Sequence, residues 1–131
     1  MNNIYTAKQV KAFEENSFIK KGDDLRAMMQ AAKQSVEELN KDFSKSEFLI
    51  LCGPGNNGGD GYFIGIGLNK LKKRVKFLDV LDCVKKSPLC EYAFEAAKDL
   101  EFINSKTLKD ISSKTVLVDA IFGIGGRINL G

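Results

Sequence analysis

Residues 53–62, GPGNNGGDGY, combine glycines with two amides and a carboxylate directly behind the apolar run FLILC. Gly53, Gly55 and Gly58 satisfy the G-x-G-x-x-G pattern of a dinucleotide-binding loop, in which the backbone approaches a pyrophosphate and a helix N-terminus attracts its charge. Asp79, near the end of the next apolar run, could bind a ribose hydroxyl. This interpretation predicts a nicotinamide dehydrogenase.

The carboxylate of Asp60 argues against that interpretation. It falls where a phosphate would approach the helix start, and two anions need a cation between them. The sequence contains no histidine, so the usual alcohol-activating base of a dehydrogenase is missing. A chain of 131 residues also leaves no room for a full substrate domain. A Walker phosphate loop fits less well, because no Gly-Lys-Ser or Gly-Lys-Thr follows the glycines.

Asn57 and Asp119 could instead supply oxygen ligands to a hard cation. Each follows an apolar run, and the carboxyl ends of parallel strands meet at the ligand crevice of an open α/β sheet. A structural interpretation carries equal weight: Asn57 would tolerate a left-handed turn, and Asp119 would cap the following AIFG turn. The residues alone leave both interpretations open.

The hydrophobic pattern predicts alternating strands and helices around these residues. Continuous apolar runs predict strands buried on both faces, and apolar residues at helical spacing predict helices. Ser87 and Pro88 would form the cap and first turn of one helix, and Thr6 and the Asp at residue 23 would cap two earlier helices. Gly65 and Gly67 would allow close contact between a helix and the sheet. Helices are expected at 6–21, 23–43, 62–74 and 87–100, strands at 47–52, 75–82 and 115–123, and weaker elements at 101–104 and 105–111. This order predicts a parallel α/β fold.

The composition excludes several classes of protein. With 20 Lys and Arg against 17 Asp and Glu, the formal charge of +3 indicates neither a nucleic-acid nor a membrane partner. The N-terminus lacks the apolar core of a secretory signal, and no run approaches the roughly 18 apolar residues of a membrane span, so we expect a cytoplasmic protein. Cys52, Cys83 and Cys90 suggest neither a disulfide framework nor a zinc site, and are expected to be buried.

The quoted glycine segment, together with VDAIFGIGGR at residues 118–127, resembles the N-terminal YjeF domain, the NAD(P)H-hydrate epimerase family. The segments YTAKQVKAFEE and LRAMMQAAKQSVEEL resemble that family's two leading helices, so the resemblance extends over the whole chain. It implies a single domain over residues 1–131, an α/β Rossmann-like three-layer sandwich with a mainly parallel central sheet and two N-terminal helices.

The function that this resemblance implies is that of an isomerase. It would interconvert the R and S forms of hydrated NADH or NADPH, so that a partner dehydratase, fused or separate, can restore the cofactor. The resemblance further implies a potassium ion bound by Asn57 and Asp119, and a homodimer. The implied substrate-binding residues are Asn56, Asn57, Gly58, Gly59, Asp60, Gly123, Ile124, Gly125, Gly126, Arg127, Ile128 and Asn129.

The sequence departs from the family pattern in two respects. The family's D-x-P-S-G segment, with its catalytic aspartate and a potassium-ligating serine, is absent from these residues. The resemblance therefore places the catalytic aspartate beyond Gly131 and implies a domain incomplete at its C-terminus, with no catalytic residue assigned within residues 1–131. In addition, Ile124 and Gly126 stand where family members often have Thr and Leu.

Two alternative functions are a non-catalytic YjeF-like dimerising module and a generic NAD(P)-binding oxidoreductase fragment. Asn57, Asp60 and Asp119 argue against the first, because a scaffold does not need cation ligands. The missing histidine and the short chain argue against the second.

Overall fold

The computed structural model describes residues 4–6 and 23–122. Within these ranges the helices are α2 (Asp24–Asp42), α3 (Asn56–Lys70), α4 (Pro88–Ala97) and the 3₁₀ helix η3 (Ser105–Asp110). The strands are β1 (Ile4–Thr6), β2 (Glu47–Cys52), β3 (Val75–Asp79), β4 (Phe102–Ile103) and β5 (Thr115–Ala120). None of these helices combines the length and the apolarity needed to cross a membrane.

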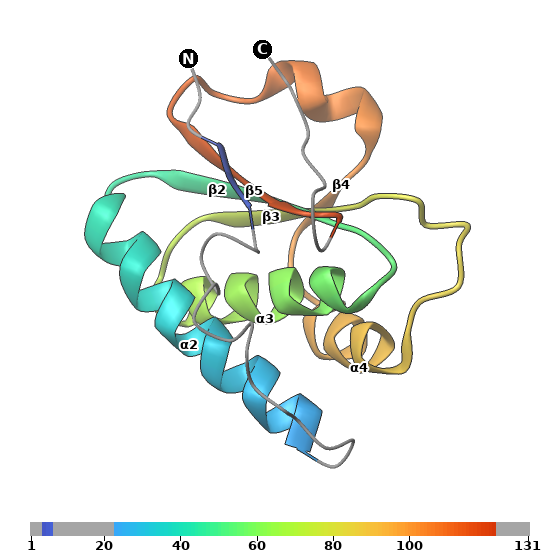
Figure 1. Ribbon diagram of the computed structural model, residues 1–131. Helices are drawn as coiled ribbons and strands as arrows, with labels where there is room; N and C mark the ends of the chain where they lie inside the picture. Colours follow the sequence, from blue (N-terminus) through green and yellow to red (C-terminus); the bar gives the residue numbers. More distant parts are fainter. Residues whose placement is uncertain (1–3, 7–22, 123–131) are drawn as a thin grey trace.

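The described strands form one sheet in the order β1-β5-β2-β3-β4, with every neighbouring pair parallel (Figure 1). In register, Leu51 of β2 lies beside Asp119 of β5, and Cys52 lies beside Asp79 of β3. The parallel α/β architecture is therefore confirmed. The short strand β1 was not predicted, because three residues at the edge of a sheet carry no usable hydrophobic period.

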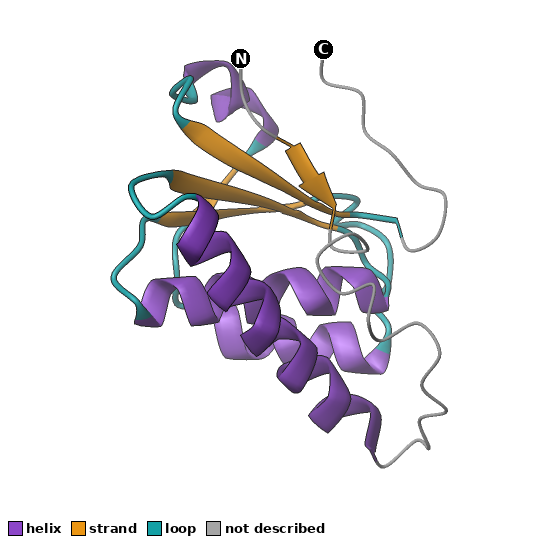
Figure 2. Ribbon diagram, turned by 60° about the vertical axis from the view of Figure 1, so that its left-hand side comes forward, coloured by secondary structure: helices purple, strands orange, loops and turns teal. Residues whose placement is uncertain are grey.

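Helices α2, α3 and α4 cover one face of the sheet, and η3 lies on the other side (Figure 2). The helix-covered face carries the larger apolar core, which joins these helices to β2, β3 and β5. A smaller apolar cluster on the opposite face contains Leu49, Leu51, Leu117 and Ile121. Because β2 and β5 contribute to both clusters, their continuous apolar sequences are explained by burial on both faces. Apart from Thr6, the predicted helix at residues 6–21 lies outside the described residues.

An aromatic cluster fills the space between the sheet and α3 and α4. The ring of Tyr62 lies 5.4 Å from that of Phe77 and 5.6 Å from that of Phe94, and the Phe77 and Phe102 rings lie 5.1 Å apart. These separations are in the favourable range for tilted and edge-to-face ring pairs. The cluster therefore fixes how α3 and α4 lie on β3 and β4.

Helix α2 matches its predicted range closely. Its Met28 is buried, whereas the neighbouring Met29 is 49% exposed. Asp23 holds the N-cap position without a side-chain cap hydrogen bond. By contrast, α4 begins as predicted, since Ser87 accepts a hydrogen bond from Cys90 N and Pro88 is the first helical residue.

Two glycines in the second half of α3 allow close packing, as their positions indicated. A Cβ atom on Gly65 would lie 2.3 Å from a ring carbon of Phe77 on β3, which confirms the helix-to-sheet contact. A Cβ atom on Gly67 would lie 2.6 Å from Val36 Cγ2, so this glycine contacts α2 and not the sheet. Their low helix propensity is thus offset by packing.

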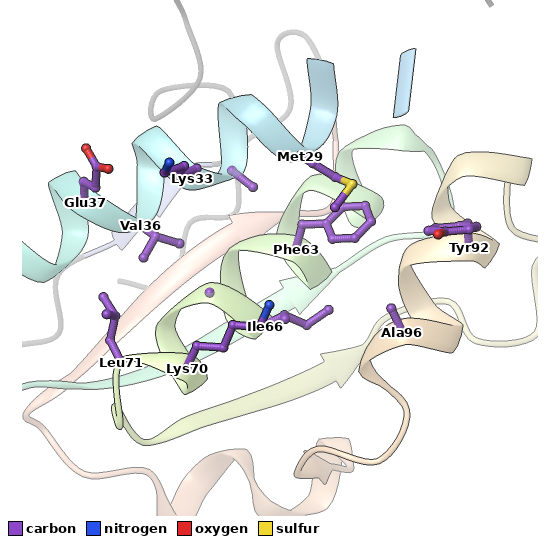
Figure 3. Close-up of a pocket in the computed structure, with 12 residues that line it drawn as sticks. Met29, Lys33, Val36, Glu37, Phe63, Ile66, Lys70, Leu71, Tyr92 and Ala96 are labelled. Atoms are coloured by element: carbon purple, nitrogen blue, oxygen red, sulfur yellow. The ribbon is translucent and has the colours of Figure 1, made fainter. Parts of the chain in front are cut away.

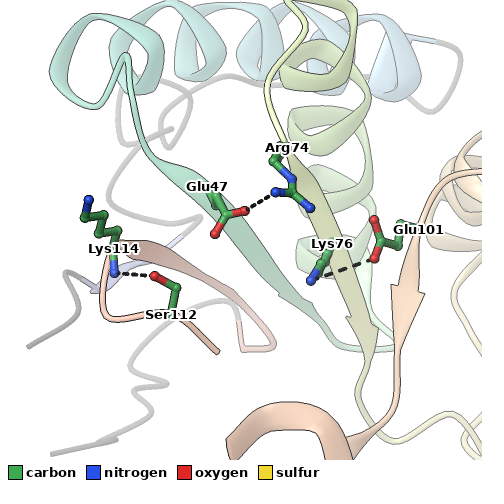
Figure 4. Close-up of polar contacts among 6 residues, drawn as sticks. All are labelled: Glu47, Arg74, Lys76, Glu101, Ser112 and Lys114. Carbon is green, nitrogen blue, oxygen red and sulfur yellow. Dashed lines mark hydrogen bonds and ion pairs between the residues drawn. The ribbon is translucent and has the colours of Figure 1, made fainter. Parts of the chain in front are cut away.

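Two surface ion pairs connect neighbouring strands at their starts (Figure 4). Arg74, just before β3, lies 3.1 Å from Glu47 of β2, and Lys76 of β3 lies 3.8 Å from Glu101, just before β4. These exposed pairs contribute little free energy, so burial and not charge holds the sheet together.

Candidate functional site

The carboxyl ends of β2 and β5 define the candidate site. From β2 the chain proceeds outward to β3 and β4, whereas β5 lies on the other side of β2. The strand order therefore reverses between β2 and β5, and open parallel sheets bind their ligands in the crevice at such a point. The glycine segment leaves β2 at Gly53, and the predicted second loop follows β5.

Most of the glycine segment is helical. Helix α3 begins at Asn56 with Gly55 as its N-cap, whereas the sequence predicted a start at Tyr62, so that boundary was wrong. The glycines lower helix propensity, but tertiary contacts override it here. Five of the predicted substrate-binding residues form the beginning of the helix and not a loop: Asn56, Asn57, Gly58, Gly59 and Asp60. The N-terminus of α3 consequently lies at the strand-order reversal.

Gly58 holds the first turn of α3 against the end of β2. A Cβ atom on Gly58 would lie 1.8 Å from the carbonyl oxygen of Gly53, so no side chain fits. The N-cap Gly55 makes no side-chain cap bond, and a Cβ atom there would meet no described atom within 4 Å. The helix start is therefore fixed on its inner side and accessible on its outer side, where its first N–H groups can bind an anion.

Asn57 connects the helix start to the end of β5. Its side chain is 7% exposed, and its Nδ2 group donates a hydrogen bond to the carbonyl oxygen of Phe122, the second residue after β5. The interpretation of Asn57 as a left-handed turn residue was wrong, because Asn57 is helical. This contact joins the start of α3 to Phe122, the last residue that the structure describes after β5.

Asp119 lies near the end of β5 and is 2% exposed. Its Oδ1 atom accepts a hydrogen bond of 3.0 Å from the backbone N–H of Ile121. The predicted capping of the turn after β5 is thereby confirmed. This hydrogen bond is made by Oδ1 alone, so the role of the carboxylate as a cation ligand stays a prediction.

Asp60 is a buried residue of α3. It lies beyond the first turn of the helix and is 3% exposed. The expectation that its carboxylate lies close to a bound phosphate stays a prediction.

Asn56 is exposed at the first position of α3, and its partner lies on another helix. Ser87 Oγ, at the N-cap of α4, donates a 2.5 Å hydrogen bond to Asn56 Oδ1. The exposed helix start is therefore attached to α4 as well as to the end of β2.

The predicted second binding segment lies outside the described residues. This holds for Gly123, Ile124, Gly125, Gly126, Arg127, Ile128 and Asn129. Gly131, beyond which the catalytic aspartate was expected, lies outside them as well. The structure therefore assigns no catalytic residue within the described ranges, and the position expected for that aspartate stays a prediction.

Residues 25–130 match the protein family described as YjeF-related protein N-terminus. The chain belongs to this family. Its YjeF-type domain is 32% identical over 127 residues to an NAD(P)H-hydrate epimerase of Weissella koreensis, and 27% identical over 131 residues to one of Oenococcus oeni. In each case the alignment covers 95% of this chain.

These relatives are longer than this chain. The alignments cover 58% and 61% of the two epimerases, so the chain spans about three fifths of their length. A longer relative, a bifunctional NAD(P)H-hydrate repair enzyme of Methanocaldococcus jannaschii, is 31% identical over 140 residues, which are 27% of its length.

A solved structure supports the fold of the YjeF-type domain. The crystal structure of yeast ynu0, YNL200c, superposes with a TM-score of 0.61 at 18% sequence identity, covering 98% of this chain and 60% of the yeast chain. At this identity the similarity establishes the Rossmann-like fold alone.

Asp79, the residue considered for a ribose hydroxyl, is engaged within the YjeF-type domain. Its Oδ2 atom lies 2.9 Å from Lys86 Nζ, and the two side chains are only 18% and 9% exposed. Lys86 also lies 4.5 Å from the centre of the Phe94 ring. Neither Lys86 nor Ser87 was identified from the sequence as part of this region, because their contacts depend on how α4 packs beside α3.

The two buried cysteines of the domain are poor nucleophiles. Burial raises the pKa of Cys52 well above its ordinary value, and raises that of Cys90 to about 11. Cys90 Sγ lies 3.4 Å from the carbonyl oxygen of Gly53. The prediction of burial is confirmed for these two and wrong for Cys83, which is exposed.

A hollow of about 770 Å³ lies elsewhere on the domain, on the outer side of the helix layer (Figure 3). It lies between α2, α3 and α4, and Met29 and Tyr92 on its wall are 49% and 56% exposed. We call it the helix-layer groove; its lining residues are Met29, Ala32, Lys33, Val36, Glu37, Phe63, Ile66, Gly67, Lys70, Leu71, Tyr92 and Ala96. Its mainly apolar lining suits protein packing better than nucleotide chemistry.

Proposed function

We propose that this protein is an isomerase that interconverts the R and S forms of hydrated NADH and NADPH. Membership of the YjeF-related family and the names of its relatives as NAD(P)H-hydrate epimerases support this function. The observation that carries it in the structure is the start of α3, placed against the end of β2 at the strand-order reversal by Gly58. That position suits the pyrophosphate of a nucleotide.

In this proposal the backbone does most of the binding. The first N–H groups of α3 donate to the pyrophosphate oxygens, and the helix dipole favours their negative charge. Gly55, whose Cβ position meets no described atom within 4 Å, leaves no side chain on the outer side of the helix start. The proposed second phosphate-facing segment, residues 123–129, follows Phe122 in sequence, and the carbonyl oxygen of Phe122 accepts the hydrogen bond from Asn57.

We propose Asn57 and Asp119 as ligands of a potassium ion. The donor chemistry fits, because an amide oxygen and a carboxylate are hard oxygen ligands. Asp119 is buried near the end of β5, and Asn57 is buried in the first turn of α3, which follows the adjacent strand β2. The Nδ2 group of Asn57 donates to the carbonyl oxygen of Phe122, so the side-chain oxygen of Asn57 points away from that carbonyl. A bound monovalent cation would screen the Asp119 carboxylate from the nucleotide phosphates.

The activity is tested with pure R-hydrate of NADPH and the full-length protein. Formation of the S-hydrate is followed with an S-specific dehydratase as the coupling enzyme, and that dehydratase is first checked on pure S-hydrate. Conversion of R to S faster than the spontaneous rate is expected. Absence of conversion with a competent coupling enzyme would refute the assignment.

We propose two partners and a compartment. The first is an NAD(P)H-hydrate dehydratase, fused or separate, since relatives of this chain include bifunctional repair enzymes. The second is another copy of this chain, as a homodimer. The expected compartment is the cytoplasm.

The helix-layer groove supports the homodimer. Its centre is apolar, and its lining includes Lys33 and Lys70 as well as Glu37, so one patch carries both signs of charge. A two-fold interface needs such self-complementarity, because the same patch contributes both sides.

Sedimentation analysis of Tyr92→Glu tests this interface. The added charge on the groove wall should shift dimers to monomers, whereas Leu81→Glu, at an equally exposed apolar residue outside the groove, should not. A wild-type monomer at high concentration, or equal behaviour of both variants, would contradict the assignment of the groove.

A further inference from the structure

The connection between β3 and α4 contacts the glycine segment through several hydrogen bonds. The backbone N–H of Ser87 donates to the carbonyl oxygen of Pro54 at 2.8 Å, and the thiol of Cys90 donates to that of Gly53 at 3.4 Å. The Ser87 hydroxyl donates to Asn56 Oδ1, across 31 residues of sequence. The start of α4 is thus bound to the start of α3.

The Ser87 hydroxyl makes two different hydrogen bonds. It accepts from the backbone N–H of Cys90 at 3.2 Å, which is the N-cap of α4, and it donates to Asn56. A hydroxyl has one proton and two lone pairs, so both bonds form at once. Capping alone requires only an acceptor, so it does not account for the bond to Asn56.

The second bond sets the orientation of the Asn56 amide. Because Oδ1 accepts the Ser87 proton, the NH₂ group lies on the opposite side of the planar amide, with its two donors available. A phosphate oxygen is bound by donors and repelled by a carbonyl oxygen. Asn56 is exposed and is the first residue of α3, so these donors stand beside the helix N–H groups.

Ser87 itself is held in place from the other side. Lys86 forms its 2.9 Å ion pair with Asp79 of β3 and lies over the Phe94 ring of α4. At the other end of this connection, the backbone N–H of Val80 donates to the carbonyl oxygen of Cys52 at 2.8 Å. The position of the Ser87 hydroxyl is therefore fixed by the domain before any ligand binds.

We propose that Ser87 is a positioning residue, which holds the Asn56 amide with its NH₂ donors toward a phosphate group of the bound dinucleotide. This role rests on the proposed function for the identity of the ligand. Ser87 does not touch the reacting ring and acts only through Asn56.

The test is a double-mutant cycle on the full chain, with the S-hydrate of NADPH titrated by calorimetry. Ser87→Ala should weaken binding about three- to tenfold, the size of one typical net hydrogen bond. Ser87→Thr keeps both the acceptor and the proton and should bind as the wild type does. In an Asn56→Ala background, Ser87→Ala should have no further effect on affinity.

Thermal unfolding separates this role from helix capping. Removal of the cap should lower the melting temperature in both the Asn56 and the Asn56→Ala background, whereas the effect on affinity should appear only with Asn56 present. An affinity loss of equal size in both backgrounds, or no loss in Ser87→Ala, would overturn the proposal.

A spectroscopic measurement on the protein without ligand tests the positioning role of Ser87 independently of the proposed epimerase function. The side-chain amide of Asn56 should shift in proton–nitrogen correlation spectra of Ser87→Ala and stay unchanged in Ser87→Thr. If the wild type binds no hydrate, the proposed function fails, and this signal then decides on the positioning role: no shift in Ser87→Ala overturns it.

Discussion

The two halves of α3 are built on different principles. In the first half, residues 56–61, Gly58 brings the helix backbone against the main chain of Gly53 at the end of β2, whereas Gly59 and Gly61 face mainly side chains. In the second half, from Tyr62 onward, glycines make room for side chains, as Gly65 does for the Phe77 ring. The first kind of contact cannot relax, because both partners are main chain. The second can relax when a side chain is altered, so the position of Gly58 should tolerate far less change than that of Gly65.

The largest effect is expected from Gly58→Ala. Helix propensity alone would favour alanine by about 1 kcal/mol, but the new Cβ atom would meet the Gly53 carbonyl oxygen at 1.8 Å. We expect destabilisation of about 3 kcal/mol or more in urea unfolding, and loss of nucleotide binding. Gly55→Ala, with open space around the new Cβ atom at the N-cap, is the matched control and should cost no more than about 1 kcal/mol. Similar stabilities of the two variants would show that backbone approach does not constrain the first half.

Gly65→Ala should have a smaller and repairable effect. Its Cβ atom would meet the Phe77 ring at 2.3 Å, and that ring is confined by Tyr62 and Phe102. We expect a loss of about 1–3 kcal/mol in unfolding free energy, part of which returns when Phe77→Leu is added. Nucleotide affinity, measured per folded molecule, should be unchanged. A variant that folds stably but no longer binds would break the distinction between the two halves.

Asn57→Ala and Asp119→Ala probe the cation proposed beside the first half. Each should weaken nucleotide binding about tenfold in potassium buffer and remove its dependence on potassium, because the cation screens carboxylate from phosphate. Asp119→Asn retains an oxygen to cap the Ile121 N–H and removes the charge, so it separates capping from ion binding. If affinity is the same in potassium and in a large organic cation for the wild type, the cation role is wrong.

The same division explains which features the sequence could predict. Strands β2 and β5 follow from continuous apolar runs, and α4 follows from Ser87 and Pro88, because burial and capping leave local signatures. The start of α3 could not be predicted in this way, because glycine disfavours a helix in isolation. Only packing against the end of the neighbouring strand explains why the helix begins at Asn56.

The long-range polar contacts at the site could not be predicted from the sequence either. For Asn57 and for Asp119 the sequence left two roles open, a structural one and that of a cation ligand. The hydrogen-bond partner of Asn57 is the backbone carbonyl of Phe122, which the identity of residue 122 does not reveal. The bond from Ser87 to Asn56 requires α4 to lie beside α3, which periodicity cannot show. Residues at strand ends were therefore predictable as a group, but their individual partners were not.

The smallest perturbation is a thiol titration, which tests how closely the first half of α3 is packed at the strand ends. Cys90, bonded to the Gly53 carbonyl, and Cys52, at the end of β2, have raised pKa values because burial disfavours the thiolate, whereas Cys83 is exposed. With the pKa of Cys90 at about 11, about one molecule in a thousand carries that thiolate at pH 8. An aromatic disulfide reagent at pH 8 should therefore modify one thiol rapidly in the native protein and three after denaturation, and Cys83→Ser should abolish the rapid phase.

The protonated form of Cys90 is favoured in the folded state, so its contribution to stability is complete below the ordinary pKa of 9.0 and is lost as the pH rises through about 11. Rapid modification of two thiols at pH 8 would mean that the α3 start separates from the strand ends in solution, and the rigid backbone contact inferred for Gly58 would then be wrong.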